Sequence, residues 1–142
     1  MNEPINPKQP ESIVAAPIDA IEWRRRLDGI AGLNAKLGLY RIRDNLDAYK
    51  RILTAFISGH AEEVTQLTDA LATDDLPTLK DIAHSLKGSG GTIGAERVAE
   101  TATLLDSALR NQAATSEIET YTRTLIAELA VLVEGIRNAL KV

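Results

Sequence analysis

The sequence contains no cysteine among its 142 residues. That absence excludes a disulfide scaffold, a thiol nucleophile and every zinc or iron–sulfur site that is built on cysteine. Long apolar runs are absent as well, because none approaches the roughly 20 residues that a membrane-spanning helix needs. The N-terminus carries polar residues where a signal peptide has an apolar stretch. We therefore expect a cytoplasmic protein that has no membrane partner.

Basic residues are too few to dominate the charge. Lys and Arg number 16 against 20 Asp and Glu, which gives a formal net charge of −4. Proteins that bind nucleic acid usually present a clustered basic surface, so we expect no nucleic-acid partner. Hydrophobic residues make up 44% of the chain, which is enough for one core in a domain of this length.

Proline is scarce outside the N-terminus. Four of the five prolines lie in the first 17 residues. Because proline fixes φ and lacks an N–H donor, residues 1–16 are expected to form a flexible tail or linker. From Pro17 onward, apolar residues recur every three or four positions, and no segment alternates with period two. The sequence thus predicts an all-α domain at residues 17–142.

The spacing of the apolar residues predicts four sizeable helices with short connections. This pattern is typical of an antiparallel four-helix bundle, here with one or two additional helices at the N-terminus. The first of these is expected to place Ile18, Ile21 and Leu27 on one side. The first helix of the bundle, beginning near residue 46, is expected to continue through Gly59, which bends the helix without ending it. The glycine-rich stretch at residues 88–91 is expected to join two helices.

Polar residues mark the expected starts of three helices. An Asp-Asn pair at residues 44–45 can cap the first helix of the bundle, and an Asp-Asp pair at residues 74–75 can cap the second. The spacing Ser116-x-x-Glu119 is typical of a capping box. It predicts that the last helix begins near residue 116.

The chain has two histidines, and their surroundings differ. His60 lies at the expected bend, where we interpret it as a solvated or capping residue. His84 lies on a helix with four apolar residues in one narrow sector, namely Leu79, Ile82, Ala83 and Leu86. At about 100° per residue, His84 points about 150° away from that sector. Its imidazole is therefore expected to lie in water.

Lys87 and Gly88 follow His84 by three and four residues, which places both beside it on the helix surface. Neutral imidazole can attack phosphorus, and an unperturbed pKa near 6.5 keeps most of it neutral at about pH 7. Lys87 can screen the charge of a bound phosphoryl group, and Gly88 leaves room for a bulky donor. An exposed histidine beside a lysine is nevertheless common, so this geometry is also consistent with a histidine that has no function.

One segment, residues 83–95, reads AHSLKGSGGTIGA. It resembles the signature of histidine-containing phosphotransfer (HPt) domains, which is A-H-x-L-K-G followed by small residues and then G-A or G-L. Residues 46–56 are similar to the preceding helix of that family. The resemblance covers about residues 30–112, with a weaker continuation in the last helix. It implies a helical bundle that serves as the histidine phosphotransfer module of a multistep phosphorelay.

The resemblance also implies roles for individual residues. His84 would be the phosphoacceptor, modified on the ring nitrogen farther from the backbone, and Lys87 would stabilise the phosphoryl group. Asp106 stands where the family more often has Glu or Gln. Its shorter side chain makes a contact with the imidazole doubtful, and a solvated carboxylate is an equally open interpretation. The expected docking residues are Gly88, Ser89, Gly90, Gly91, Thr92 and Asp106.

Receiver domains of response regulators or of hybrid histidine kinases are the partners that the resemblance implies. The receiver would supply Mg²⁺, while this chain would bind no metal or other cofactor and would act as a monomer, either alone or as the C-terminal part of a membrane-anchored hybrid kinase. Two alternatives remain open. His84 could be phosphorylated directly by an ATP-binding kinase domain, although no nucleotide-binding or kinase domain is recognisable in this sequence. The chain could also be a helical adaptor in which His84 plays no part.

Overall fold

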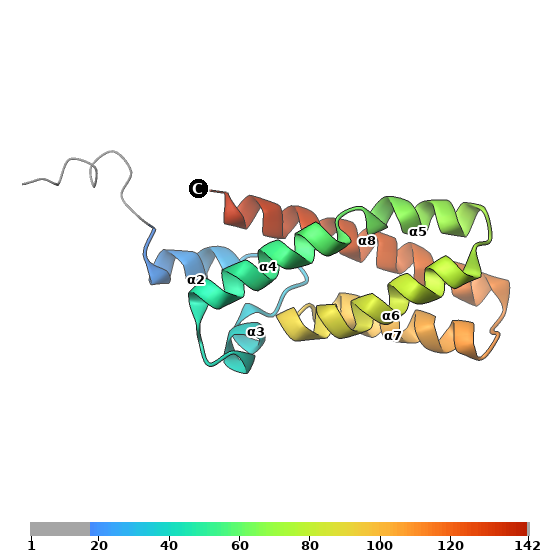
Figure 1. Ribbon diagram of the computed structural model, residues 1–142, viewed down its shortest axis with the longest axis horizontal. Coiled ribbons are helices and arrows are strands. Elements are labelled where there is room, and N and C mark those ends of the chain that lie inside the picture. Colours follow the sequence, from blue (N-terminus) through green and yellow to red (C-terminus); the bar gives the residue numbers. More distant parts are fainter. Residues whose placement is uncertain (1–17, 142) are drawn as a thin grey trace, which may run out of the picture.

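The computed structural model describes residues 18–141, and within them it contains helices and no strand (Figure 1). The all-α prediction is therefore confirmed. The tail expected at residues 1–16 lies outside the described residues. The helices are α2 (Ala20–Asp28), α3 (Ala35–Arg41), α4 (Leu46–His60), α5 (Glu63–Ala72), α6 (Leu76–Ile93), α7 (Glu96–Arg110) and α8 (Thr115–Leu140).

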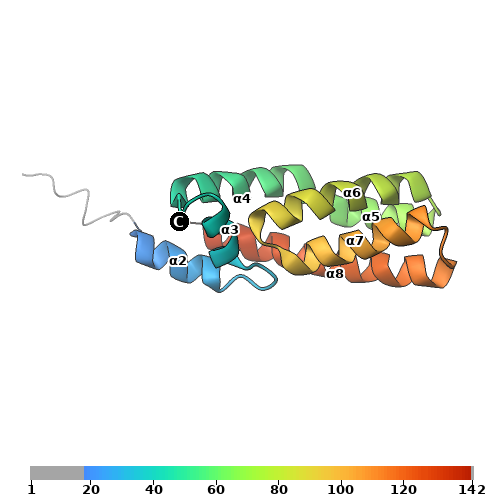
Figure 2. The ribbon, with the colours of Figure 1, turned by 90° about the horizontal axis from the view of Figure 1, so that it is seen from below.

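The antiparallel four-helix bundle is confirmed, with its first helix in two pieces. Helices α4 and α5 follow one another along the bundle, and α6, α7 and α8 complete it (Figure 1). Helix α6 packs against α7 and against both α4 and α5, while α8 packs against α7 on one side and against α4 and α5 on the other. Two additional helices, α2 and α3, lie at the end of the bundle where α6 ends (Figure 2).

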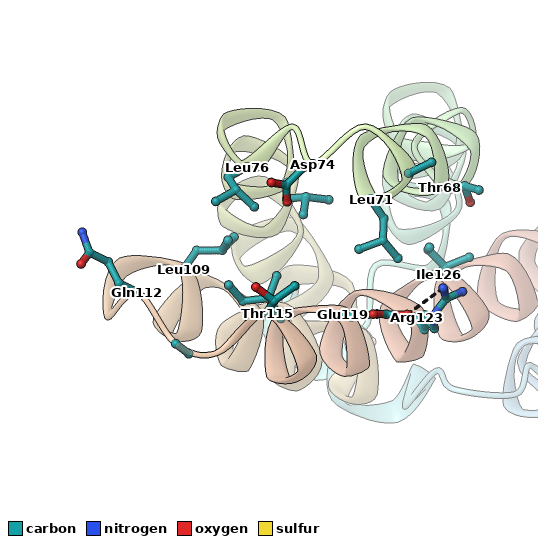
Figure 3. Close-up of a pocket in the computed structure, with 14 residues that line it drawn as sticks. Thr68, Leu71, Asp74, Leu76, Leu109, Gln112, Thr115, Glu119, Arg123 and Ile126 are labelled. Carbon is teal, nitrogen blue, oxygen red and sulfur yellow. Dashed lines mark hydrogen bonds and ion pairs between the residues drawn. The ribbon is translucent and has the colours of Figure 1, made fainter.

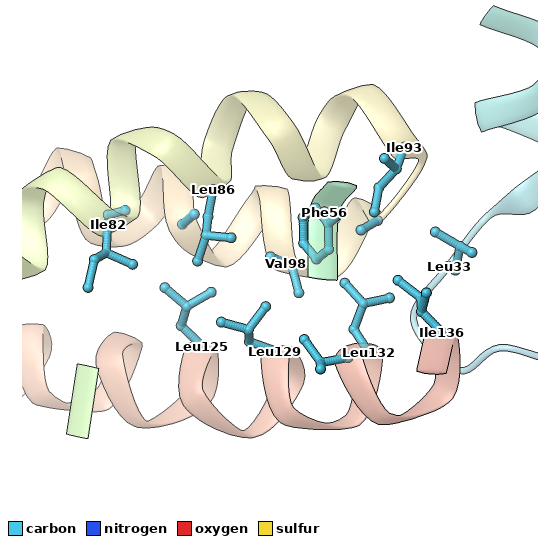
Figure 4. Close-up of a cluster of buried hydrophobic side chains, with 14 of the residues drawn as sticks. Leu33, Phe56, Ile82, Leu86, Ile93, Val98, Leu125, Leu129, Leu132 and Ile136 are labelled. Atoms are coloured by element: carbon cyan, nitrogen blue, oxygen red, sulfur yellow. The ribbon is translucent and has the colours of Figure 1, made fainter. Parts of the chain in front are cut away.

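Leucine and isoleucine side chains from α6 and α8 meet in the centre of the bundle (Figure 4). Leu86 of α6 points toward Leu125 and Leu129 of α8, and all three are fully buried. Burying one such side chain contributes about 1.5–3 kcal/mol. The apolar stripes of the helices thus supply the main driving force for the fold, and they determine which face of α6 turns outward.

The single helix expected to pass through Gly59 is interrupted. Helix α4 ends at His60 and α5 begins at Glu63. The interruption is short, since the Ala61 N–H still donates to the Ile57 carbonyl at 2.9 Å. Gly59 weakens the helix just before this point, and the side chains of His60 and Glu63 contact each other across the break at 2.6 Å.

The glycine-rich stretch is helical, so the junction expected at residues 88–91 is wrong. Helix α6 continues to Ile93, and the chain turns at Gly94, whose φ of 89° lies in the left-handed region. A Cβ atom on Gly90 would lie 3.4 Å from the Ala99 nitrogen. Gly90 thus faces α7 at ordinary van der Waals distance, and the packing of α6 against α7 supports the helix through its glycines.

All three predicted helix starts are confirmed to within one residue, and two of the three predicted caps are present. The Asn45 side chain accepts a hydrogen bond from the Ala48 N–H, and the Asp75 side chain accepts one from the Thr78 N–H. The capping box is wrong, because α8 begins at Thr115 and its N-cap residue, Ala114, makes no side-chain cap. Position 116 therefore lies within the first helical turn, and Glu119 pairs with Arg123 at 2.8 Å instead.

The inward face of α2 differs from the expected one. Ile21 is 79% exposed, whereas Trp23 and Leu27 are buried. Positively charged groups cover the Trp23 ring: Lys50 Nζ lies 4.2 Å and Arg26 Cζ lies 5.4 Å from the ring centroid. Trp23, four residues before Leu27, thus takes the place that the apolar pattern assigned to Ile21.

Helix α3 is attached to the C-terminal end of α6 by specific polar contacts. The Asn34 N–H donates to the Gly94 carbonyl at 2.8 Å, and the Tyr49 hydroxyl of α4 donates to the Ile93 carbonyl at 2.6 Å. A Cβ atom on Gly38 would collide with that same Ile93 carbonyl. Glycine at position 38 is therefore required for α3, α4 and α6 to meet at this point.

Candidate functional site

His84 is exposed on the outer face of α6, as its position in the helical pattern predicts. The opposite face of α6 is buried in the bundle, with Leu79, Ile82, Ala83 and Leu86. Among the described residues, none forms a hydrogen bond with the imidazole of His84. The ring is thus accessible from outside the bundle, with both nitrogens open to an incoming group.

Lys87 and Asp106 form an ion pair next to His84. Lys87 Nζ donates to Asp106 Oδ2 at 3.2 Å, and Arg110 Nε lies 3.3 Å from the same oxygen. Asp106 is only 3% exposed. The interpretation of this residue as a solvated carboxylate is therefore wrong, since it is a buried anion of α7 that holds two cations.

The environment of Asp106 determines its ionisation. Burial by itself would raise the pKa of the carboxyl, whereas the hydrogen bond and charge of Lys87 lower it. The charges of Arg110 and His84 act in the same direction, so the pKa of Asp106 lies below its ordinary value. At neutral pH, Asp106 is therefore a carboxylate that fixes the position of the Lys87 ammonium group.

These side chains surround a shallow hollow between α6 and α7. Its lining residues are Lys80, Asp81, His84, Lys87, Asp106 and Arg110. Lys80 and Arg110 were not among the residues proposed from the sequence. Their spacing is a signal that could have identified them, because Lys80 lies one helical turn before His84 and Arg110 lies one turn after Asp106.

The expected docking residues do not all lie on the face of His84. Gly88 and Gly91 lie on that side of α6, and a Cβ atom on either would have no neighbouring atom within 4 Å. Gly90 is buried against α7, so it does not line the surface. Thr92 is exposed, and its hydroxyl donates to the Gly88 carbonyl at 3.0 Å. Ser89 points away from His84 toward α4.

His60 is the partner of Ser89, and its interpretation as a solvated or capping histidine is wrong. The residue is 8% exposed. Its Nδ1 lies 2.6 Å from Glu63 Oε1, and its Nε2 lies 2.8 Å from Ser89 Oγ. His60 lies four residues after the buried Phe56, so it continues the inward stripe of α4. This spacing could have predicted that His60 is buried.

A larger concavity lies at the end of the bundle away from α2 and α3 (Figure 3). It is bounded by the turn between α5 and α6, by the turn between α7 and α8, and by the first turns of α8. Leu71, Leu76 and Leu109 contribute to its apolar wall, and Glu119 pairs with Arg123 at its rim. None of the residues around the imidazole of His84 lines it, so it does not belong to this site.

Residues 18–141 lack the features of two other classes of site. No helix in this part of the chain is long and apolar enough to cross a bilayer. The same residues contain no group of three or more His, Cys, Asp or Glu side chains that could hold a metal ion.

Comparison with known families identifies the domain. The family model of the Hpt domain matches residues 51–139, which is more than half of the chain. No curated protein and no solved structure matches. The matched segment contains most of α4, all of α5 to α7 and most of α8, and therefore includes His84, Lys87 and Asp106. The chain belongs to the Hpt domain family, whose function is histidine phosphotransfer in phosphorelays.

Proposed function

We propose that His84 is the phosphoacceptor of this domain. It accepts a phosphoryl group from the aspartyl phosphate of one receiver domain and passes it to the aspartate of another. The observation that carries this proposal is the exposure of the His84 imidazole on the outer face of α6, beside the Lys87–Asp106 pair. The other histidine, His60, is buried with partners at both ring nitrogens, which leaves it no lone pair facing solvent.

The transfer exchanges one bond to phosphorus for another. The lone pair of His84 Nε2 attacks the phosphorus, and a P–N bond forms. The bond between phosphorus and the aspartate oxygen breaks, and its electron pair leaves with the carboxylate of the receiver. The proton on His84 Nδ1 remains in place during this step. The reverse sequence of events delivers the group to the second receiver.

Lys87 stabilises the phosphoryl group while Asp106 positions Lys87. An ammonium group has three donors, and only one of those of Lys87 is used by Asp106. A second donor can therefore reach a phosphoryl oxygen on His84 without loss of the ion pair. Arg110 also pairs with Asp106, so this buried carboxylate keeps a cation even when Lys87 moves toward the phosphoryl group.

The receiver completes the site. We propose that it supplies Mg²⁺, which neutralises charge on the phosphoryl oxygens when the two proteins are docked. The contribution of this chain is an oriented imidazole and one positioned cation. Gly88 gives the receiver access, because no side chain stands between the backbone of α6 and the approaching partner.

Phosphorylation with a labelled receiver domain tests the assignment. The wild-type chain should acquire label that is stable in base and lost in acid, as expected for phosphohistidine, and His84→Gln should acquire none. His60→Gln is the matched control, since it removes the only other histidine, and it should still be labelled. Label retained on the His84→Gln chain would show that another residue is the acceptor.

A further inference from the structure

Two glycines of α6 have no explanation in the packing of the bundle. Glycine inside a helix is less stable than alanine because its backbone loses more freedom on folding. A Cβ atom on Gly90 would be in ordinary van der Waals contact with α7, 3.4 Å from the Ala99 nitrogen. A Cβ atom on Gly88 or Gly91 would meet nothing within 4 Å. The packing of the bundle therefore does not require glycine at positions 88 and 91, and both positions are open to a body outside the bundle.

Both glycines lie on the face of α6 that carries His84. Gly91 follows His84 by seven residues, which is close to two helical turns and about 10 Å along the helix axis. Gly88 lies between them. From His84 toward the C-terminal end of α6, positions 88 and 91 of this face have no side chain of their own, so they form a strip along which another protein can approach the backbone closely.

The strip ends at helix α3. Arg41, at the end of α3, donates from its Nη1 to the Gly91 carbonyl. Figures 1 and 2 show α3 beside the C-terminal end of α6. A guanidinium has five N–H donors, and this contact uses one. Among the described residues no carboxylate lies within ion-pair distance of Arg41, which is exposed. Its neighbour Tyr40 is 78% exposed.

We propose that the docking surface for the receiver domain extends from His84 over Gly88 and Gly91 to α3, where Arg41 binds a carboxylate of the receiver. This inference rests on the proposed function of His84, because that residue places the receiver at one end of the strip. Arginine and tyrosine are among the residue types that contribute most often to interface energy, and both lie at the other end of the strip. Tyr40 packs beside the receiver at this edge.

Helix α3 lies outside the segment that matches the family model. The match to the Hpt domain begins at residue 51, after α3 has ended. The site around His84 therefore provides the chemistry common to the family, and α3 contributes to the choice of receiver. A partner that carries a carboxylate opposite Arg41 is favoured over one that carries a cation there.

Binding measurements with a receiver domain test this surface. The probe is a purified receiver domain that exchanges phosphoryl groups with the wild-type chain, titrated into the unphosphorylated protein by calorimetry. Arg41→Glu and Gly91→Leu should each weaken binding by about tenfold or more, and higher receiver concentrations should restore transfer. Gly59→Leu and Arg123→Ala are the matched controls. Gly59 is also an exposed helical glycine with no neighbour within 4 Å, and Arg123 is an exposed arginine paired with Glu119 on α8.

The outcomes separate this inference from the assignment of His84. Wild-type affinity in both Arg41→Glu and Gly91→Leu would overturn the extended surface, and so would a loss of transfer at saturating receiver with unchanged affinity. Circular dichroism of each variant checks that the helices are intact. Gly91→Leu tests the affinity of the docking surface in a variant whose α3 sequence is unchanged. His84→Gln should take no label, whatever its affinity for the receiver. If it took label, the phosphoacceptor assignment would fail, while the affinities would still report on α3.

Discussion

Nζ of Lys87 lies 3.2 Å from Oδ2 of Asp106, so the cation nearest to His84 in the sequence pattern is held by a buried carboxylate from the neighbouring helix. The ion pair orients the ammonium group beside the imidazole before any phosphoryl group arrives. Because Arg110 shares the same oxygen of Asp106, the three residues act as one unit. This arrangement leads to distinct expectations for the cation and for the anion.

Lys87→Ala should slow phosphoryl transfer without abolishing it. In the proposed mechanism the variant loses the cation that stabilises the phosphoryl group, but it retains the proposed nucleophile, His84, and whatever the receiver supplies. We expect a decrease of about tenfold in the rate constant at saturating receiver, a modest loss for a partly solvated donor. Rapid-quench kinetics measure this rate. Lys80→Ala is the control, because Lys80 lines the same hollow but forms no ion pair with Asp106, and it should have a smaller effect on the rate constant. An unchanged rate constant in Lys87→Ala would contradict the role of Lys87.

Asp106→Asn should reduce stability in a pH-dependent manner. The folded state lowers the pKa of Asp106. The contribution of its carboxylate to the free energy of unfolding is therefore present above the ordinary pKa of about 3.9, and it is lost as the pH falls below that value. We expect the variant to be less stable by about 1–3 kcal/mol at pH 7, and this difference should shrink below about pH 4. Urea unfolding between pH 7 and 2.5 measures it, with Asp81→Asn as the exposed control. A difference independent of pH would contradict the ion-pair explanation.

Tyr49→Phe should change the response to alkali. Burial, and then the charge of Asp28, raise the pKa of Tyr49 above its ordinary value of about 10. Above that pH the unfolded chain loses the phenolic proton while the folded chain keeps it, so wild-type stability falls by up to about 1.4 kcal/mol per pH unit.

The phenylalanine variant lacks this loss but also lacks the hydrogen bond to the Ile93 carbonyl. It should therefore be less stable than wild type at pH 8, by about 1 kcal/mol, and the difference should narrow above about pH 10. Chemical unfolding at a series of pH values checks this. Tyr40→Phe, at an exposed tyrosine, should not show the narrowing. If the free energies of unfolding of wild type and Tyr49→Phe changed with pH in parallel, the raised pKa of Tyr49 would be contradicted.

Alanine at two glycines should have opposite effects on the free energy of unfolding. Gly88→Ala should stabilise the protein by about 0.5–1 kcal/mol, because the added methyl group meets no atom and the helix gains propensity. Gly38→Ala should destabilise it by about 1–3 kcal/mol, because the methyl group collides with the Ile93 carbonyl and the Tyr49 ring. Thermal or urea unfolding measures both. Destabilisation by Gly88→Ala would mean that packing within the bundle, and not access for a partner, accounts for that glycine.

The helical pattern allowed the outward direction of His84 to be predicted. Whether a residue faces the core depends on neighbours three and four positions away, so Leu79, Ile82 and Leu86 define the buried face of α6. The caps at Asn45 and Asp75 were predictable for the same reason, since each hydrogen bond spans three residues. The phosphotransfer signature is equally local, because it lies within residues 83–95.

Contacts between helices could not be predicted in this way. Asp106 is buried and paired with Lys87 because α7 packs against α6, and the two residues are 19 positions apart in the chain. The same cause buries His60 against Ser89 and places Arg41 against Gly91, across 29 and 50 positions. The sequence by itself determined which residues form helices and which face of each is apolar. Only the tertiary structure decided which faces meet, because that choice depends on the packing of all the helices together.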